Sequence, residues 1–247
     1  MHRISRQLAL SLLLVSSNTW ADEIRVAVAS NFIGAIDALA RQFESDTDHK
    51  VTRMIGSSGK HYAQIHNGAP YDLFFSADSR RPRLLEEVGE AVSGSRFTYA
   101  TGRLALWSPD NDTVDEGGAV LERGDFRYLA IANPKLAPYG KAAQEFLETR
   151  KLWKKLRRRV VRGENIGQAF QFVRSGNAGL GLVAYSQIKR PGEPIKGSWW
   201  EVPQRLYTPI AQQAVLIRES AAARSFLTYV KSDQGKALIR NHGYGTP

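Results

Sequence analysis

Short strand-like runs alternate with helical runs along this chain, and that alternation limits the folds open to it. Ile24 to Ala29 is rich in β-branched residues, and Phe32 to Glu44 carries apolar residues at the spacing of one helix face. The same order returns in Val51 to Ile55 and Lys60 to His66. Strands linked through helices pair in parallel with right-handed crossovers. The pattern predicts an α/β fold with mixed, mainly parallel sheets flanked by helices.

Two long extended passages interrupt this alternation. They run from Phe97 to Trp107 and from Val202 to Ile217, with further strand and helix runs between them and a helical tail after them. Two such passages are expected where a chain crosses from one lobe to another and returns. We therefore predict a discontinuous first lobe of residues 22–100 and 206–247 and a second lobe of residues 101–205, joined by two crossing strands.

The first 21 residues have the pattern of a secretory signal peptide. Arg3 and Arg6 precede the apolar run Leu8 to Val15, and Thr19-Trp20-Ala21 has small residues at the cleavage positions. A run of eight residues is too short to span a bilayer. The chain has no cysteine, so it has neither disulfides nor a cysteine for a lipid anchor. We expect a soluble, exported periplasmic protein that begins near Asp22.

The charge balance is basic. Lys and Arg number 34 against 24 acidic residues, and loss of Arg3 and Arg6 lowers the formal charge from +10 to +8. That surplus fits an anionic ligand or an anionic membrane surface. The basic run Lys154 to Arg159 has no aromatic residues between its charges, so we interpret it as a solvated connection and predict no nucleic-acid partner. Its role beyond that stays open.

The turn Gly56-Ser57-Ser58-Gly59 lies between an extended run and a helical run. Glycine allows close approach of the main chain to a ligand, and a helix start supplies unpaired N–H groups and the positive end of a dipole. Such a turn is suited to an oxyanion. The alternative is that Ser58 only caps its own helix, because serine is a common N-cap.

Three further turns have the same character. Ser30-Asn31 follows the first strand, Ala137-Pro138-Tyr139-Gly140 opens a helix, and Gly163 to Gly167 places Ile166 just before another helix. Ligands of parallel sheets bind beyond the carboxyl ends of the strands. We therefore expect the four turns to converge on a cleft between the lobes.

Several motifs in order resemble the periplasmic molybdate-binding proteins of ABC importers. The likeness extends from about Glu23 to Tyr244, and each motif is of moderate specificity, whereas the ordered set is strong. It rests on Val28-Ala29-Ser30-Asn31-Phe32, Gly56-Ser57-Ser58-Gly59, Gly68-Ala69-Pro70-Tyr71-Asp72-Leu73-Phe74-Phe75-Ser76-Ala77-Asp78, Ala132-Asn133-Pro134 and Ala137-Pro138-Tyr139-Gly140. The resemblance implies a type II periplasmic-binding-protein fold that closes over molybdate or tungstate and delivers it to an inner-membrane permease.

The same resemblance implies the ligand contacts, and the chain departs from the family pattern at one of them. The implied contacts are Ser30, Asn31, Ser58, Tyr139 and the main-chain N–H of Ile166. Many members have a ligand-binding tyrosine where this chain has Ala184. Tyr185 is one residue further along, and in a strand its side chain would face the opposite side. We assign the hydroxyl role to Tyr139 and treat Tyr185 as a packing residue, although Tyr185 stays open as the hydroxyl donor.

The residue chemistry agrees with an oxyanion ligand. A deprotonated tetrahedral dianion only accepts hydrogen bonds, so hydroxyls, amides and main-chain N–H groups suit it without an arginine. We therefore predict a monomeric binding protein that is not an enzyme, with no catalytic residues, no cofactor and no side chain bonded directly to the metal. Preference between molybdate and tungstate stays open.

Three alternatives remain at this stage. A binding protein of the same fold for sulfate or phosphate would also use neutral donors. A ferric-ion binder would favour paired tyrosines and carboxylates, to which Tyr139 and Tyr185 could contribute. A secreted serine hydrolase would need a Gly-x-Ser-x-Gly elbow, and Gly56-Ser57-Ser58-Gly59 is one residue too short for it.

The signal peptide gives the first prediction. The exported protein is expected to start at Asp22 because cleavage follows Ala21. Intact-mass measurement of protein recovered from the periplasm checks it. A mass that includes residues 1–21 would contradict the assignment.

Overall fold

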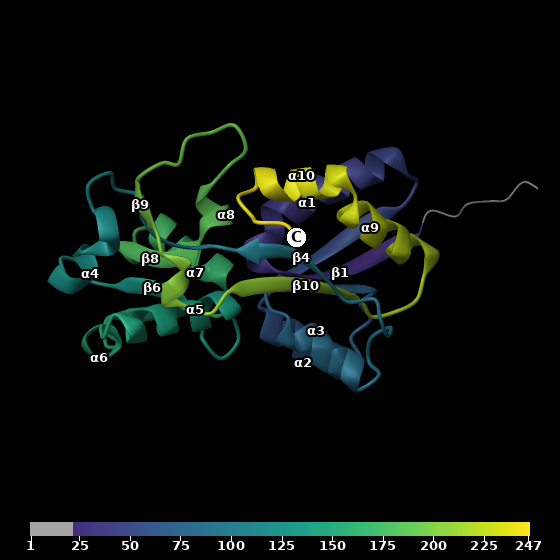
Figure 1. Cartoon of the computed structure of the whole chain (residues 1–247), viewed down its shortest axis with the longest axis horizontal. Coiled ribbons are helices and arrows are strands. Elements are labelled where there is room, and N and C mark those ends of the chain that lie inside the picture. Colours follow the sequence, from purple (N-terminus) through teal and green to yellow (C-terminus); the bar gives the residue numbers. More distant parts are fainter. Residues whose placement is uncertain (1–21) are drawn as a thin grey trace, which may run out of the picture.

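The chain forms two lobes that lie side by side, as Figure 1 shows. The computed structural model describes residues 22–247, and the predicted signal peptide lies outside these residues. Each lobe contains one five-stranded sheet with helices around it. The predicted two-sheet α/β fold is confirmed. Within residues 22–247 no helix combines the length and the apolar character that a bilayer span requires.

The two sheets are built alike. The first-lobe sheet has the order β2-β1-β3-β10-β4 and the second-lobe sheet the order β7-β6-β8-β5-β9. The strands of the first are β1 (Glu23–Ala29), β2 (Lys50–Gly56), β3 (Leu73–Ser76), β4 (Phe97–Gly102) and β10 (Ile210–Leu216). Those of the second are β5 (Leu104–Ser108), β6 (Leu129–Ala132), β7 (Val160–Gly163), β8 (Leu180–Ala184) and β9 (Ser198–Glu201).

Parallel pairs do not predominate in either sheet, which corrects one detail of the prediction. β1 pairs in parallel with β2 and β3, whereas β10 pairs antiparallel with β3 and β4. The second sheet repeats this division, with β6 parallel to β7 and β8 and with β5 antiparallel to β8 and β9. The reason is the crossing itself, because β4 leaves the first lobe and β10 returns to it, so the two strands run in opposite directions.

The first-lobe sheet is covered by helices on both faces. Alternate residues of β1 divide between them: Val26 and Val28 pack with α1 (Ile33–Asp46), α9 (Ala221–Lys231) and α10 (Asp233–Asn241), whereas Ala27 packs on the side of α2 (Ser58–His66) and α3 (Arg80–Glu87). This is the period-two pattern of a strand buried on both faces. The predicted helical tail is thus two helices, because Ser232 ends α9 and caps α10 through the N–H of Gly235.

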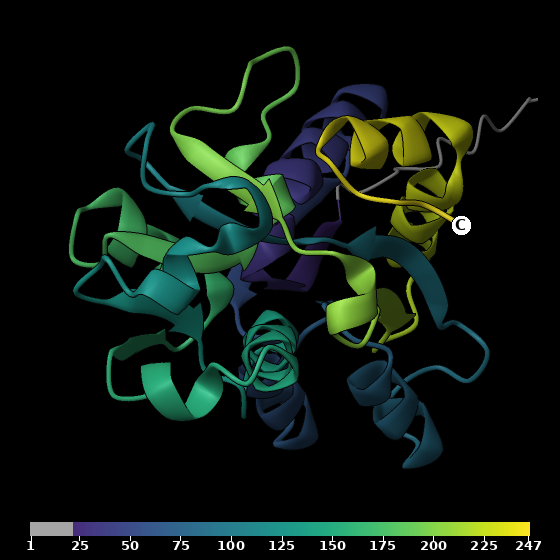
Figure 2. The same ribbon diagram turned by 60° about the vertical axis from the view of Figure 1, so that its left-hand side comes forward.

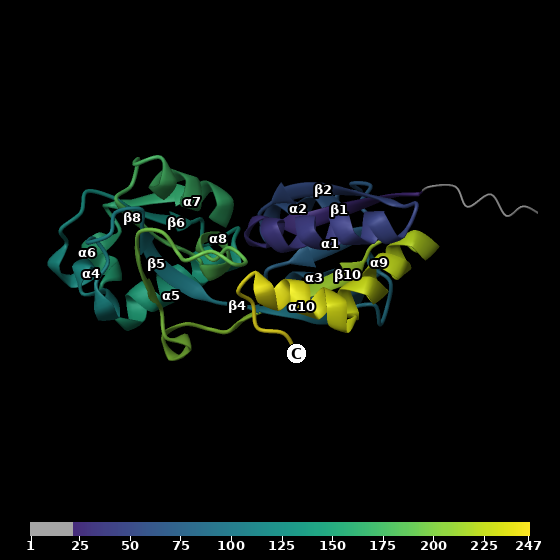
Figure 3. The same ribbon diagram turned by 90° about the horizontal axis from the view of Figure 1, so that it is seen from above.

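The second lobe has the same layers. Leu106 of β5 and Ile131 of β6 pack against α5 (Pro138–Thr149), and Ala130 packs toward α7 (Ile166–Arg174). Figure 3 shows these two helices on opposite sides of the sheet. Three one-turn helices, α4 (Val120–Arg123), α6 (Trp153–Leu156) and α8 (Tyr185–Ile188), complete the lobe. The basic run begins in α6 and leads into β7, so it connects a helix to a strand.

The chain changes sheets at two places. The first is between Gly102 and Leu104, and the second is between Glu201 and Ile210, through the 3-10 turn Gln204–Leu206. Figure 2 shows the tail after α10 returning beside β4, where Gly245 forms an antiparallel bridge with Thr101. The division at residues 100/101 and 205/206 stays a prediction, but the tail is part of the first lobe, because Tyr244 is buried in its core.

Candidate functional site

A small cavity lies between the lobes, at the carboxyl ends of β1, β2, β6 and β7. We call it the central cavity, and the space in it that the centre of a water molecule can reach is ≈ 10 Å³. That is about the least that one water molecule needs, so the cavity is far too small for a drug-sized ligand and has room only for a very small solute. All of its lining residues are uncharged: Ala29, Ser30, Asn31, Gly56, Ser57, Ser58, Ala77, Ala137, Pro138, Tyr139, Asn165 and Ile166. The five sequence-predicted residues are among them.

The first lobe supplies two turns to the cavity. Ser30 and Asn31 form the 3-10 turn Ser30–Phe32, called η1, between β1 and α1, and both are buried. After β2, Ser57 is the N-cap of α2, since its side chain accepts the N–H of Lys60 at 3.3 Å, and Ser58 is the first helical residue. The interpretation of Ser58 as the cap is therefore wrong, and its hydroxyl is used elsewhere.

The second lobe supplies two helix starts. Tyr139 is the second residue of α5, after Pro138, and is almost fully buried. Ile166 is the first residue of α7, and Asn165 caps that helix by accepting the N–H of Gln168 at 3.0 Å. Sequence reasoning did not single out Ser57 and Asn165, although both are residue types that commonly precede a helix.

Unpaired main-chain donors gather at the cavity because helices begin there. The first N–H groups of a helix have no partner four residues earlier. Ser58, Tyr139 and Ile166 each occupy one of the first two positions of α2, α5 or α7, and within residues 22–247 no acceptor within bonding distance faces their N–H groups. The positive ends of the three helix dipoles meet at the same place, so the cavity favours negative charge.

The two serine hydroxyls are oriented by bonds to their oxygens. The Oγ of Ser58 accepts the N–H of Ala77 at 2.9 Å, and the Oγ of Ser30 accepts the N–H of Gly167 at 3.1 Å. Each Oγ therefore accepts a hydrogen bond from the main chain, and the proton of each hydroxyl remains available for a bond to a ligand. In the described residues neither hydroxyl donates to another group. The second bond crosses from one lobe to the other.

A buried hydrogen-bonded network supports the cavity from below. Gln212 of β10 accepts from Asn31 Nδ2 at 2.7 Å and from the hydroxyl of Tyr99 at 3.0 Å, and its own amide donates to the hydroxyl of Tyr139 at 3.5 Å. Asn31 Nδ2 also donates to the hydroxyl of Tyr244, which donates to the Asn31 carbonyl at 2.6 Å. Burial raises the pKa of Tyr99, Tyr139 and Tyr244, so each stays protonated.

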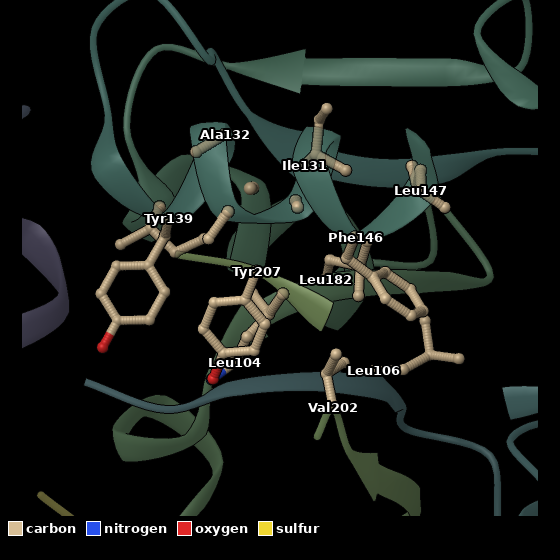
Figure 4. Close-up of a cluster of buried hydrophobic side chains, with 14 of the residues drawn as sticks. Leu104, Leu106, Ile131, Ala132, Tyr139, Phe146, Leu147, Leu182, Val202 and Tyr207 are labelled. Atoms are coloured by element: carbon tan, nitrogen blue, oxygen red, sulfur yellow. The ribbon is translucent and has the colours of Figure 1, made fainter. Parts of the chain in front are cut away.

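This network changes the role expected of Tyr139. Figure 4 shows its ring at the edge of the second-lobe core, with the hydroxyl pointing away from Phe146 and Leu147. The hydroxyl reaches Gln212 and lies beside Gly102, where an added Cβ would be 2.3 Å from its oxygen. Contact between the hydroxyl and a ligand stays a prediction, and the main-chain N–H of Tyr139 is a second donor that sequence reasoning missed.

Gln212 was also missed, and the sequence did contain a signal for it. Gln212 is fully buried within β10, whose other inward residues are apolar. A polar side chain in a buried strand must find partners, so it marks a network. One atom of the network, Asn31 Oδ1, is buried without a partner in residues 22–247.

A histidine side chain lies against the turn Gly56 to Gly59. His61 of α2 contacts the Val28 carbonyl through Nε2 at 3.1 Å, and a Cβ on Gly56 would be 2.8 Å from that nitrogen. The ring thereby ties the end of β1 to the turn after β2. Burial lowers the pKa of His61, so the ring is neutral at neutral pH and adds no charge under the cavity.

Tyr185, which stayed open as the hydroxyl donor, and Lys60, the cation beside the turn Gly56 to Gly59, both lie outside the cavity lining. Tyr185 is the first residue of α8 and not part of the strand, and it packs under the Arg103 guanidinium and against Trp199. Lys60 forms an ion pair with Glu164 of the other lobe at 3.3 Å. That pair joins the two lobes but does not line the cavity.

Two similar lobes that enclose a small uncharged cavity define a two-lobed binding protein. The model of the bacterial extracellular solute-binding proteins matches residues 24–245. The molybdate-binding protein ModA of Azotobacter vinelandii is 45% identical over 96% of this chain and 95% of its own length, and that of Rhodobacter capsulatus is 46% identical over 92% and 89%. The solved structure of the Azotobacter vinelandii periplasmic molybdate-binding protein has a TM-score of 0.88, with 44% identity over 91% of this chain and 99% of that one. The chain therefore belongs to the bacterial extracellular solute-binding proteins, and to the molybdate-binding proteins among them.

The network gives the second prediction. Gln212→Leu removes one acceptor from Asn31 and Tyr99 and one donor from Tyr139. Loss of partners for buried polar groups should lower the free energy of unfolding by about 1–3 kcal/mol. Urea denaturation measures it, with Gln144→Leu as control because Gln144 donates to Glu148 of its own helix at an exposed site. Equal stability of both variants would show that the network contributes little.

Proposed function

We propose that this protein captures molybdate, or tungstate, which is nearly equal to it in size, between its lobes and delivers it to the permease of an ABC importer in the inner membrane. It acts in the periplasm, as a monomer, and the proposal assigns it no catalytic step. The carrying observation is the central cavity, where donors from the starts of α2, α5 and α7 and from the turn Ser30–Phe32 meet without a charged side chain. The name and the 45% identity of the Azotobacter relative support the same ligand.

The donors match a fully deprotonated tetrahedral dianion. The hydroxyls of Ser30 and Ser58 have protons to give, and the N–H groups of Ser58, Tyr139 and Ile166 add main-chain donors. Hydrogen bonds to a charged acceptor are shorter and about twice as strong as neutral ones. Such a set replaces the water around the ion without the repulsion that a carboxylate would cause.

Phosphate is the second candidate ligand, because the cavity wall contains one unpaired acceptor, Asn31 Oδ1, within the described residues. Hydrogen phosphate carries a proton and needs an acceptor, and Asn31 Oδ1 is buried without a partner in the described part of the chain. Calorimetric titration with molybdate, tungstate, sulfate, phosphate and ferric citrate separates the candidates. Tight binding of molybdate and tungstate alone supports the proposal, and tight binding of phosphate alone would replace it.

The third prediction concerns Ser58. Ser58→Ala removes one donor to a buried anion, which should cost about 1.5–3 kcal/mol of binding, or about ten- to a hundredfold in Kd for molybdate. The variant should also melt earlier, because the N–H of Ala77 loses its acceptor.

Ser95→Ala is the control for that stability effect. Ser95 is a buried first-lobe serine away from the cavity, and its Oγ accepts the N–H of Leu216 at 3.1 Å. It should lose stability to a similar degree and keep the affinity for molybdate. An equal loss of affinity in both variants would show that Ser58 acts only through folding.

The fourth prediction concerns movement of the lobes. Ser30, Asn31 and Ser58 lie on one lobe and Tyr139 and Ile166 on the other, so a single ion can satisfy all of them only when the lobes meet. The ligand should shift the protein toward this closed state, with the segments between the sheets as hinges. Small-angle scattering should give a smaller radius of gyration with molybdate and no change with sulfate. Identical curves with and without saturating molybdate would contradict closure.

A further inference from the structure

The lobes touch through main-chain groups of two glycines. The N–H of Gly59 on the first lobe donates to the carbonyl of Leu136 on the second at 2.9 Å. The N–H of Gly167 on the second lobe donates to the Oγ of Ser30 on the first at 3.1 Å. Each glycine is the second residue of its helix, α2 or α7, so each lobe presents the same feature to the other.

Local backbone conformation does not require glycine at either place. Neither Gly59 nor Gly167 is among the positive-φ glycines of residues 22–247. Glycine also disfavours a helix relative to alanine. Its presence in the first turn of both helices therefore needs another reason.

The reason is the closeness of the opposite lobe. A Cβ on Gly59 would lie 2.9 Å from the Leu136 oxygen and 3.1 Å from the Leu136 Cα. A Cβ on Gly167 would lie 3.0 Å from the Oδ1 of Asn165 in its own lobe and 3.3 Å from the Cβ of Ser30 in the other lobe. The partner of Gly59 is main chain at the turn before α5, which cannot rotate aside as a side chain can. At Gly59 the lobes thus approach until backbone meets backbone, and at Gly167 the main chain of one lobe meets the side chain of Ser30 on the other.

From these contacts we infer that Gly59 and Gly167 set how far the lobes close, and with it the size of the tetrahedral oxyanion that the cavity accepts. Neither residue lines the central cavity, so neither acts by touching the ion. Each glycine directly follows a residue of the cavity wall, since Gly59 follows Ser58 in α2 and Gly167 follows Ile166 in α7. A fixed closest approach gives the cavity a fixed width.

The width decides which ion is bound well. At full closure, donors on both lobes reach a large tetrahedral ion together. A smaller ion leaves some donors too far away, because N–H···O hydrogen bonds have donor–acceptor distances of about 2.7–3.2 Å. The backbone contacts prevent the lobes from closing further around the smaller ion. The inference rests on the proposed function, since it concerns selection among oxyanions at the same site.

Gly59→Ala tests it. The added Cβ must move from 2.9 Å to at least the 3.4 Å of ordinary van der Waals contact, which holds the lobes about 0.5 Å further apart. Titration with sodium molybdate should show an affinity about tenfold lower or more. Competition with selenate, a smaller tetrahedron, should show a larger loss for selenate, so the ratio of the selenate to the molybdate Kd should rise. Gly167→Ala should change both values in the same direction.

Two controls separate this effect from folding and from the proposed function. Gly59→Ala should melt no earlier than the parent protein, since alanine favours the helix. Gly179→Ala should bind as the parent does, because Gly179 is exposed and a Cβ there meets no atom within 4 Å. If the parent protein does not bind molybdate, the proposed function is refuted. The distance between the two lobes then tests the inference without a ligand.

That measurement compares crystal structures of Gly59→Ala and of the parent protein, both grown without added oxyanion, in which the distance between residue 59 and Leu136 should be longer in the variant by several tenths of an ångström. Unchanged molybdate affinity, an unchanged interlobe distance, or a Kd ratio that stays equal or falls would each overturn the inference.

Discussion

The central constraint on this protein is that several helices begin at one buried place. Helix starts carry N–H groups without partners, and a buried donor without a partner costs about 1–3 kcal/mol. The protein satisfies some of them itself: Ser57 and Asn165 cap α2 and α7, and Ser30 accepts from Gly167. The N–H groups that remain belong to Ser58, Tyr139 and Ile166, which all line one cavity. The arrangement of both sheets follows from this, because only the carboxyl ends of strands such as β1, β2, β6 and β7 can deliver helix starts to a common point.

The sequence predicts much of this and misses the rest for identifiable reasons. Alternating strands and helices predict the sheets, and glycine and serine turns after strands predict where helix starts gather. Serine is a common N-cap, but the sequence pattern does not show which of two adjacent serines caps a helix. The sequence alone therefore cannot distinguish Ser57, which caps α2, from Ser58, which is its first residue. Tyr185 is predicted in the strand but begins α8, because α8 follows β8 directly and no glycine or proline separates the two. Gln212 pairs with Asn31, 181 residues away, and no local pattern reveals such a partner.

The charges of the chain are arranged around a neutral centre. Within residues 22–247 no charged side chain lines the central cavity, and the ion pair of Lys60 with Glu164 joins the lobes outside that lining. Inside, burial keeps His61 neutral and the three tyrosines protonated. A site without charged side chains can attract an anion through oriented dipoles and still release it, because no opposite full charge holds it. That balance suits a protein that must both collect a solute and give it up.

The tail after α10 joins the last residues of the chain to the centre of the molecule. Tyr244 bonds both the side-chain amide and the carbonyl of Asn31, and Gly245 pairs with Thr101 on the strand that leads to the second lobe. Tyr244 is thus in contact with a residue of the cavity wall. A cysteine introduced at Thr246, two residues further along, would be the one thiol among the 247 residues and could carry a fluorophore close to that wall. This segment is therefore a place where solute capture could be turned into an optical signal.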